Sequence, residues 1–364
     1  EPVGVRVPLF DGKTLQGWHV TGCEAAVENG VLVIKEGNGL LRTDHRYRDF
    51  ILEISYKPRQ AEKYDSGIYI RGELPPEGKP FPSKHQINLK QGDEANLIGF
   101  KEARSTGLVK PGEWNQLKVT VIGETVAMVI NGQPAWQTSG LKDSEGYIGI
   151  QVEVPLGGQY EFKEIAVTEL GYTSLFNGKD LTGWEGANED AAKCWQVVDG
   201  LLECTGKKGP WLRSQQEYGD YNLRLAYKLK EGGNSGVFIR VPKNGEHHGD
   251  QSGIEIQLLD DRAPRYDKLK AYQYTGSLYA IVAADPRVAH EAGEWNTMEI
   301  DCRDRQYRII HNGVLVLSAN AEQHPELAKR LTSGFLGLQN HSEQVWFRDL
   351  RIGPSQQAEP IAAK

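Results

Sequence analysis

Three segments in the second half of the chain alternate polar with apolar side chains, as a half-buried β-strand does. They are NSGVFIR (234–240), GIEIQLLD (253–260) and GFLGLQNH (334–341). Because successive side chains of a strand point to opposite faces, the apolar residues predict a core face and the others a second face. That second face also carries glycines, at which a ligand could approach. Its polar members are Asn234, Arg240, Glu255, Gln257, Gln339 and His341, with Asp260 just beyond its strand.

If the three strands are neighbours in one sheet, these side chains form a concave polar groove. A carboxylate and an imidazole can exchange protons near neutral pH, and amides can hydrogen-bond the hydroxyls of a sugar. The groove would therefore suit acid–base chemistry on a carbohydrate. The alternative is that the outer face of any sandwich is polar simply because it meets water.

The elements that position these residues occur twice, because the chain repeats itself. Matched blocks include LFDGKTLQGW (9–18) and LFNGKDLTGW (175–184), YDSGIYIR (64–71) and GNSGVFIR (233–240), and PGEWNQLKV (111–119) and AGEWNTMEI (292–300). Seven such blocks stand in the same order in both halves. The repeats run from about 9 to 170 and from 174 to 353, which predicts two domains, 1–170 and 171–364.

The repeat also indicates which half could be catalytic. The positions of Glu255, Gln257, Asp260 and His341 correspond to Gln86, Asn88, Gln91 and Glu153 in the first half. A Gln amide can bind a hydroxyl but does not exchange protons as Glu does. The first domain is therefore predicted to be ancillary or sugar-binding, and the second to carry the active site. The second also gains 12 residues, since the offset between matched residues rises from 169 at Ser66 to 181 at Trp114.

Each repeated block predicts strand, turn and strand, because Asn-Gly and Asp-Gly pairs separate alternating apolar runs. Helical periodicity is confined to short stretches at 267–272 and 325–331. About a dozen short strands per unit are typical of an antiparallel sandwich or jelly roll. The predicted fold is all-β, with two antiparallel β-sandwich domains in tandem.

Composition excludes several classes of protein. No apolar run approaches the roughly 18 residues of a membrane-spanning helix. The net charge of −7 and the lack of a Lys/Arg cluster argue against nucleic-acid binding. The motifs of dinucleotide, P-loop, zinc-protease and serine-hydrolase sites are not found. The spacing of Cys23, Cys194, Cys204 and Cys302 indicates neither a zinc site nor a disulfide framework, and free buried thiols are expected.

Two further groups of residues are candidates for the groove. The EHHGD run at 246–250 could bring His247 or His248 to the rim, although a solvated loop is the favoured interpretation. Four aromatic residues have no clear aromatic counterpart in the first half, so one or two of them could stack on a ligand. These four are Trp211, Tyr218, Tyr274 and Tyr279, and of them Tyr274 is predicted to bind substrate.

The series LFNGKDLTGW, VVDGLLE, GNSGVFIR, GIEIQLLDD, YTGSLY, GEWN, GFLGLQNH and VWFRDLRI resembles the 3-keto-disaccharide hydrolase family. The resemblance covers essentially the whole chain as two copies, and it is specific in the second copy and degraded in the first. It implies a concanavalin A-like jelly roll and a carbohydrate substrate. It also implies a secreted or periplasmic location, with any signal peptide already removed, and cleavage of glycosides oxidised to a ketone at C3.

The chemistry of a 3-keto sugar suggests roles for the groove residues. The ketone acidifies the C2 hydrogen, so one base can remove it while the C1 leaving group departs by β-elimination and water then adds. Glu255 or His341 is the predicted base, and Asp260 or the other of that pair the acid. The predicted substrate-binding residues are Asn234, Arg240, Gln257, Gln339 and Tyr274. No cofactor is required, although a divalent cation on Glu255, Asp260 or His341 is an alternative to amide donors.

The same polar residues are compatible with two other functions. A non-catalytic, lectin-like protein would use the same polar faces to bind sugar without cleaving it. An ordinary glucanase would need two carboxylates flanking the glycosidic bond. Glu255 is followed two residues later by Gln257 and not by a second acid, which disfavours the glucanase.

Overall fold

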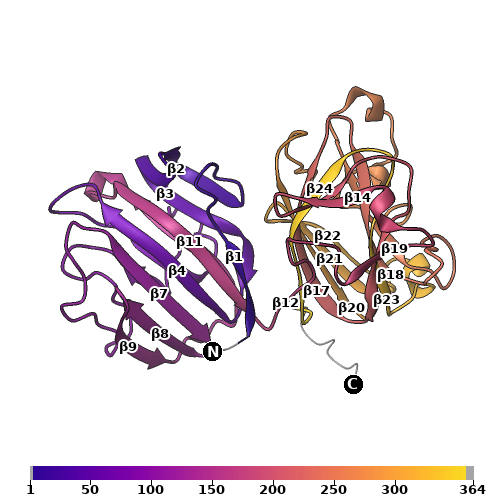
Figure 1. Ribbon diagram of the computed structural model, residues 1–364. Coiled ribbons are helices and arrows are strands. Elements are labelled where there is room, and N and C mark those ends of the chain that lie inside the picture. Colours follow the sequence, from indigo (N-terminus) through magenta and orange to yellow (C-terminus); the bar gives the residue numbers. More distant parts are fainter. Residues whose placement is uncertain (1–2, 358–364) are drawn as a thin grey trace, which may run out of the picture. The chain divides into compact units, whose positions relative to one another are not determined.

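The computed structural model describes residues 3–357, and the chain divides into two compact units after Gly171. Each unit consists of antiparallel strands, as Figure 1 shows, so the all-β prediction is confirmed. The first unit contains β1 (Gly4–Pro8), β2 (Trp18–Glu28), β3 (Val31–Tyr47), β4 (Phe50–Pro58), β5 (Gly67–Gly72), β6 (Gln86–Asn88), β7 (Asn115–Ile122), β8 (Thr125–Ile130), β9 (Gln133–Ser139), β10 (Gly146–Glu153), the 3₁₀ turn η1 (Val154–Leu156) and β11 (Tyr160–Leu170).

The second unit has a matching series of short strands and little helix. Its strands are β12 (Thr173–Ser174), β13 (Trp184–Gly186), β14 (Trp195–Val198), β15 (Leu201–Cys204), β16 (Leu212–Tyr218), β17 (Tyr221–Leu229), β18 (Asn234–Val241), β19 (Ile254–Leu259), β20 (Asn296–Arg303), β21 (Gln306–His311), β22 (Val314–Asn320), β23 (Gly334–Leu338) and β24 (Val345–Gly353). Its helical turns are η2 (Ala191–Lys193), η3 (Pro264–Tyr266), η4 (Ala271–Gln273) and α1 (Pro325–Ala328), the last two within or beside the stretches predicted to be helical.

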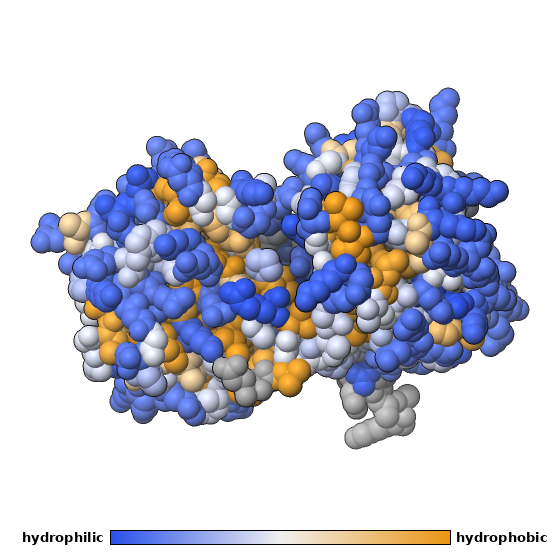
Figure 2. Space-filling view, in the orientation of Figure 1, coloured by the Kyte–Doolittle hydropathy of each residue, from blue (hydrophilic) through white to orange (hydrophobic). Residues whose placement is uncertain are grey.

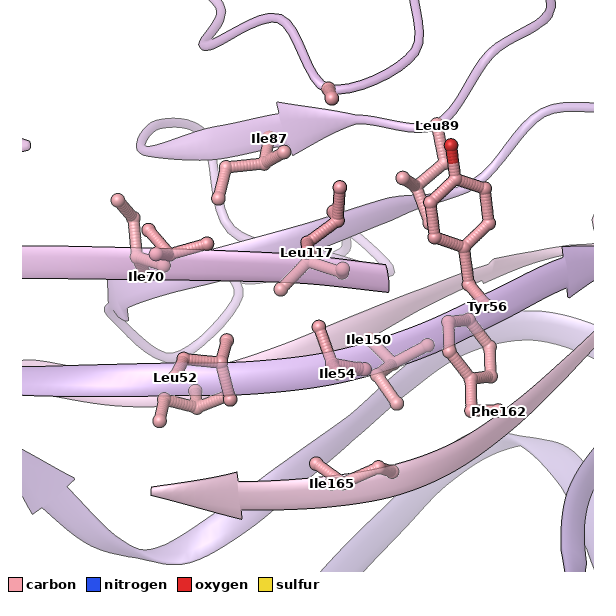
Figure 3. Packing of buried hydrophobic residues seen from close by; sticks show 14 of the residues in the cluster. Leu52, Ile54, Tyr56, Ile70, Ile87, Leu89, Leu117, Ile150, Phe162 and Ile165 are labelled. Carbon is pink, nitrogen blue, oxygen red and sulfur yellow. The ribbon is translucent and has the colours of Figure 1, made fainter. Parts of the chain in front are cut away.

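The first unit is a single 11-stranded sheet whose strand order is β6-β5-β10-β3-β11-β4-β7-β8-β9, with β1 beside β11 and β2 beside β3. Within this one sheet, the 17-residue strand β3 connects the layer that contains β10 to the layer that contains β11. One end of β3 pairs with β11 at Leu32 and Val33, while the rest pairs with β10. Figure 3 shows the aliphatic and aromatic side chains that fill the core, among them Ile54 of β4 and Ile150 of β10.

In the second unit the counterpart of β3 is broken into β15 and β16. The break contains Gly209 and Pro210, and a proline has no N–H to give to a sheet. The layers are therefore two separate sheets. Eight strands form one sheet, and the other is a five-stranded sheet with the order β13-β16-β23-β18-β19.

The core of the second unit has the predicted side-chain parity. The apolar residues expected to point inward from the five-stranded sheet are all 2% exposed or less, and they pack with residues of the eight-stranded sheet in one cluster. They are Val237, Ile239, Ile254, Ile256, Leu258, Leu336 and Leu338. Hydrophobic burial thus fixes this sheet's register, because a slip of one residue would turn every inward side chain outward.

The surface is that of an ordinary folded domain. Hydrophilic residues cover most of the face seen in Figure 2, with apolar residues in smaller patches. The four cysteines are free, as predicted; three are buried and Cys23 is half-buried. No helix among residues 3–357 is long and apolar enough to cross a membrane.

Candidate active site

The three segments with predicted functional residues are neighbours in the five-stranded sheet. Strand β18 is in the middle, and its Gly236 and Phe238 are opposite Gln257 and Glu255 of β19. On the other side β23 pairs with β18, and the N–H of Gln339 donates to the Gly236 carbonyl at 2.9 Å. The outer faces of these strands therefore form one surface.

A cavity of about 220 Å³ opens on this surface. Five of the eight predicted site residues line it, namely Asn234, Glu255, Gln257, Gln339 and His341. The other lining residues are His247, His248, Leu259, Tyr266, Leu269, Gln273 and Tyr279. At roughly 30 Å³ per water molecule, its volume is that of about seven waters, which is the scale of one sugar ring.

Glu255 is the only carboxylate among the residues that line the cavity. Its side chain crosses the central strand at Gly236, where a Cβ atom would lie 2.5 Å from Glu255 Oε1. The residue is 4% exposed, and a buried carboxylate needs a partner. That partner is His247, whose Nε2 lies 3.3 Å from Glu255 Oε2.

His247 belongs to the loop that joins β18 to β19. Its ring stacks on Phe238, with centroids 4.6 Å apart and an interplanar angle of 27°. Its Nδ1 lies 3.2 Å from the Gly245 carbonyl. Burial alone favours the neutral ring, but the hydrogen bonds to Glu255 and Gly245 and the negative charge of Glu255 outweigh it and raise the pKa of His247.

His248 stands beside this pair, with its ring centroid 4.2 Å from that of His247. Desolvation and the neighbouring charge of His247 lower the pKa of His248. The pKa values of the two neighbouring rings therefore move in opposite directions, upward at His247 and downward at His248. The sequence interpretation of this run as a solvated loop is wrong for His247, because its ring is packed and paired inside the site.

The additional residues of the second unit form part of the cavity wall. In the first unit Ile87 bridges to Leu97, and the matched Ile256 bridges to Leu278, so the insertion lies between these two residues. It contributes Tyr266, Leu269 and Gln273. The hydroxyl of Tyr279 accepts a hydrogen bond of 3.1 Å from Gln273 Nε2, which leaves the hydroxyl proton available for a ligand.

The amides provide further hydrogen-bonding groups. Gln257 Nε2 donates to Asn234 Oδ1 at 3.0 Å, which leaves the Asn234 N–H groups and the Gln257 oxygen for a ligand. The Oε1 atom of Gln339 is buried and has no hydrogen-bond partner among the described residues. His341 is at the rim with 53% of its side chain exposed, and its Nδ1 lies 3.2 Å from Glu343 Oε2.

The structure corrects the prediction for Arg240, which lies outside the cavity. The register of β18 against β23 shifts between Phe238 and Val241, and Arg240 has a φ of 51°. This irregularity breaks the alternation of side chains on which the prediction relied. The guanidinium is instead buried, donating to the Gly219 carbonyl at 2.9 Å and to Asp220 Oδ1 at 2.9 Å.

Asp260 and Tyr274 also lie outside the cavity. Asp260 Oδ2 accepts the N–H of Gly232 at 2.8 Å, and the residue lines a separate cavity of about 640 Å³. Its position past the end of β19 removes it from the face that Glu255 occupies. The Tyr274 hydroxyl donates to the Tyr266 carbonyl at 2.8 Å and so supports the cavity wall from behind.

Within residues 3–357 no group of three or more His, Cys, Asp or Glu side chains is arranged to hold a metal ion. What the cavity offers is one carboxylate, three imidazoles, four amides and two phenol hydroxyls. This set can move protons and bind hydroxyl or carbonyl oxygens.

Comparisons with known proteins identify the family of the chain. The 3-keto-alpha-glucoside-1,2-lyase-like domain family matches residues 6–168 and again residues 171–353. The chain therefore belongs to this family. A "3-keto-disaccharide hydrolase" of Bacteroides thetaiotaomicron is 25% identical over 240 residues, which cover 52% of this chain and 80% of that protein.

Solved structures resemble parts of the chain. A Parabacteroides distasonis protein described as a glycosyl hydrolase is 27% identical, with a TM-score of 0.46, and the match covers 50% of this chain and 94% of that one. The carbohydrate-binding module CBM66 of Bacillus subtilis is 12% identical, with a TM-score of 0.35, over 47% of this chain and 95% of the module.

Proposed function

We propose that the second unit cleaves glycosides whose sugar ring carries a ketone at C3, with Glu255 as the base. The observation that carries this proposal is a single buried carboxylate, paired with His247, in a cavity of about one-ring size. The other residues that line it are histidines, amides, tyrosines and two leucines. Ordinary glycoside hydrolysis needs two carboxyl groups on opposite sides of the bond. Elimination from a 3-keto sugar needs only one base at C2.

In the proposed reaction Glu255 removes the C2 proton and negative charge develops on the C3 oxygen. The hydroxyl of Tyr279 and the N–H groups of Asn234 are the hydrogen-bond donors proposed for that oxygen. The contact between His247 Nε2 and Glu255 Oε2, which raises the pKa of His247, stabilises the Glu255 carboxylate before the proton moves. The electron pair then forms the C1–C2 double bond as the C1–O bond breaks.

His341 is proposed to protonate the departing oxygen. It is at the rim, where a leaving group would pass, and the contact of its Nδ1 with Glu343 leaves Nε2 for this oxygen. Water then adds its hydroxyl to C1 and gives its proton to His341. Glu255 exchanges its acquired proton with solvent while the leaving group departs, and then delivers a solvent proton to C2. The products are the 3-keto sugar and the free aglycone, so the net reaction is hydrolysis and both residues regain their starting states.

Deuterium labelling tests the route. A nitrophenyl 3-keto-glucoside and its unoxidised parent are incubated with the full chain in D₂O, and the sugar is analysed at early times. The proposal predicts release from the keto substrate only, with deuterium at C2. Release without deuterium at C2 would indicate direct hydrolysis, and binding of both compounds with no release would indicate a lectin.

A further inference from the structure

The loop that carries His247 is held by one buried arginine from a distant part of the chain. Arg330 follows α1 and is 5% exposed. Its Nη1 donates to the His247 carbonyl at 2.9 Å and to the Gly253 carbonyl at 3.1 Å, and also contacts Ser252 Oγ. All three oxygens belong to the loop between β18 and β19.

Backbone hydrogen bonds on both sides of Arg330 reinforce this contact. The N–H of Gln251 donates to the Lys329 carbonyl at 2.7 Å, and the N–H of Leu331 donates to the Ser252 carbonyl at 3.0 Å. The segment 329–331 therefore lies along the loop, and the Arg330 guanidinium lies between the segment and the loop. The loop cannot move without breaking several hydrogen bonds at once.

A buried guanidinium that binds neutral oxygens is expensive, because the charge is desolvated without a carboxylate in contact. None of the three oxygens that Nη1 contacts is a carboxylate, and Arg330 Nε is buried without a hydrogen bond among the described residues. Such an arrangement is poorly suited to stability alone. This arrangement instead suits a side chain that fixes the main chain of the loop, at the carbonyls of His247 and Gly253.

The first unit has the loop but not this arginine. From Arg71 to Gln86 and from Arg240 to Glu255 the chain runs the same 15 residues, so the loops are equal in length. Four residues before the matched Gly-aromatic strand, the first unit has Lys142, which is 77% exposed and paired with Glu124. The position of His247 is a glycine there. The arginine and the histidine thus occur together.

We propose that Arg330 is a positioning residue that fixes the main chain at His247 so that its imidazole meets the Glu255 carboxylate. The inference rests on the proposed role of Glu255, because only then does the His247 contact matter to turnover. Without the guanidinium the His247 carbonyl is released, and the ring can leave both Phe238 and Glu255.

The test uses Arg330→Lys, which keeps the charge but loses the fork of donors, in the full chain. The imidazole titration of His247 is followed by NMR, and kcat and KM are measured across pH with a 3-keto-glucoside. The expected result is a lower pKa at His247 and a kcat reduced by about 10- to 100-fold, with KM changed much less. Ser252→Ala, which removes one acceptor, should shift both quantities in the same direction by a smaller amount.

Arg240→Lys is the matched control, because Arg240 is equally buried, lies in the same unit and binds carbonyl oxygens away from the cavity. It should lower the melting temperature while leaving the His247 titration unchanged. The inference is overturned if Arg330→Lys leaves the His247 titration where it was, or if both variants lose activity only in proportion to stability. If the titration shifts but the wild type releases no aglycone, the positioning role stands and the proposed function fails.

Discussion

The concave faces of the two units differ at the positions where side chains cross the central strand. In the first unit Gln86 Nε2 donates to Gln151 Oε1 across Gly67, and Gln151 Nε2 donates to Glu153 at 3.0 Å. These hydrogen bonds run between the protein's own groups. The matched residues of the second unit are Glu255, Gln339 and His341. There Gln339 Oε1 has no partner among the described residues, and Glu255 is paired with a residue of the adjacent loop.

The two units therefore share a scaffold and differ on its polar face. Arg71 and Arg240 have almost the same backbone, with φ of 48° and 51°, and both bind matched carbonyls. The loops that follow them are equally long, yet one has Gly78 and Lys79 where the other has His247 and His248. A few substitutions and one insertion therefore separate a face whose polar side chains bind one another from a face with a polar cavity.

The largest effect is expected when Glu255 of the second unit is replaced by glutamine, the residue that the first unit has at the matched position 86. Glu255→Gln keeps the shape of the side chain but removes the base, and general-base catalysis is worth about 10²- to 10⁴-fold. We expect aglycone release from a 3-keto-glucoside to fall by about 10³-fold. Gln86→Ala is the control and should leave release unchanged. A Glu255→Gln enzyme that keeps a tenth of its activity would remove Glu255 from the mechanism.

His247→Asn tests the pairing of Glu255 with the loop, which only the second unit has. Its effect on stability should depend on pH. The pKa of His247 is raised above its ordinary value of 6.5, so the imidazolium contact with Glu255 stabilises the fold fully below that pH. This contribution is lost as pH rises through the folded-state pKa. The melting temperatures of wild type and His247→Asn should therefore differ most in mild acid and converge in alkali. Activity should fall by roughly 10²-fold. A gap in melting temperature that widens with pH would contradict this assignment.

Gly236→Ala tests whether β18 must lack a side chain at the position that the Glu255 side chain crosses. The new Cβ would lie 2.5 Å from Glu255 Oε1, so the carboxylate must shift. We expect kcat to fall by about 10- to 100-fold, since displacements of this size misalign a catalytic group. Gly67→Ala is sterically equivalent, with its Cβ 2.1 Å from Gln86 Nε2. It should lower stability without affecting turnover, and equal losses of turnover in both variants would refute the argument.

Much of the fold and part of the site follow from sequence, because hydrophobic alternation and repeat register are local signals. They placed Glu255, Gln257 and Gln339 on one face, and the strand pairing bears this out. The assumption that glycines on that face leave room for a ligand was incomplete. Gly236 admits the Glu255 carboxylate, and Gly337 is covered by Trp211, whose Cζ3 would be 2.3 Å from an added Cβ.

The failures have physical causes that alternation does not encode. Arg240 turns inward because a bulge with positive φ interrupts the strand. The alternation of polar and apolar residues does not predict where a bulge will occur. The sequence names His247 only as a possible rim residue and favours a solvated loop, because a loop has no periodicity and the Arg330 that binds the His247 carbonyl is 83 residues away. A comparison of the two equal loops favours His247 over a solvated loop, since it replaces a glycine at the same place.

The prediction with the least effect on activity concerns the buried arginines that the units share. Arg240→Met should leave the carbonyl of Gly219 without its donor and remove one of the donors to Asp220 Oδ1, which also accepts the N–H of Asp304. A fully buried acceptor left without its donor costs about 1–3 kcal/mol, and the cost here is smaller because Gly219 is half-buried and the Asp220 side chain is 53% exposed. Arg71→Met should cost the first unit a similar amount, because Arg71 binds the Arg48 carbonyl at 2.7 Å in the same way.

Urea unfolding measures both losses, and kcat/KM at low temperature, where each variant stays folded, measures the site. Because Arg240 is outside the cavity, kcat/KM should stay within about twofold of wild type in both variants. A selective loss in Arg240→Met would mean that the arginine acts on substrate after all. Equal stability losses with intact turnover would instead show that this arginine belongs to the repeated scaffold, and that the difference between the units lies in Glu255, His247 and the inserted wall.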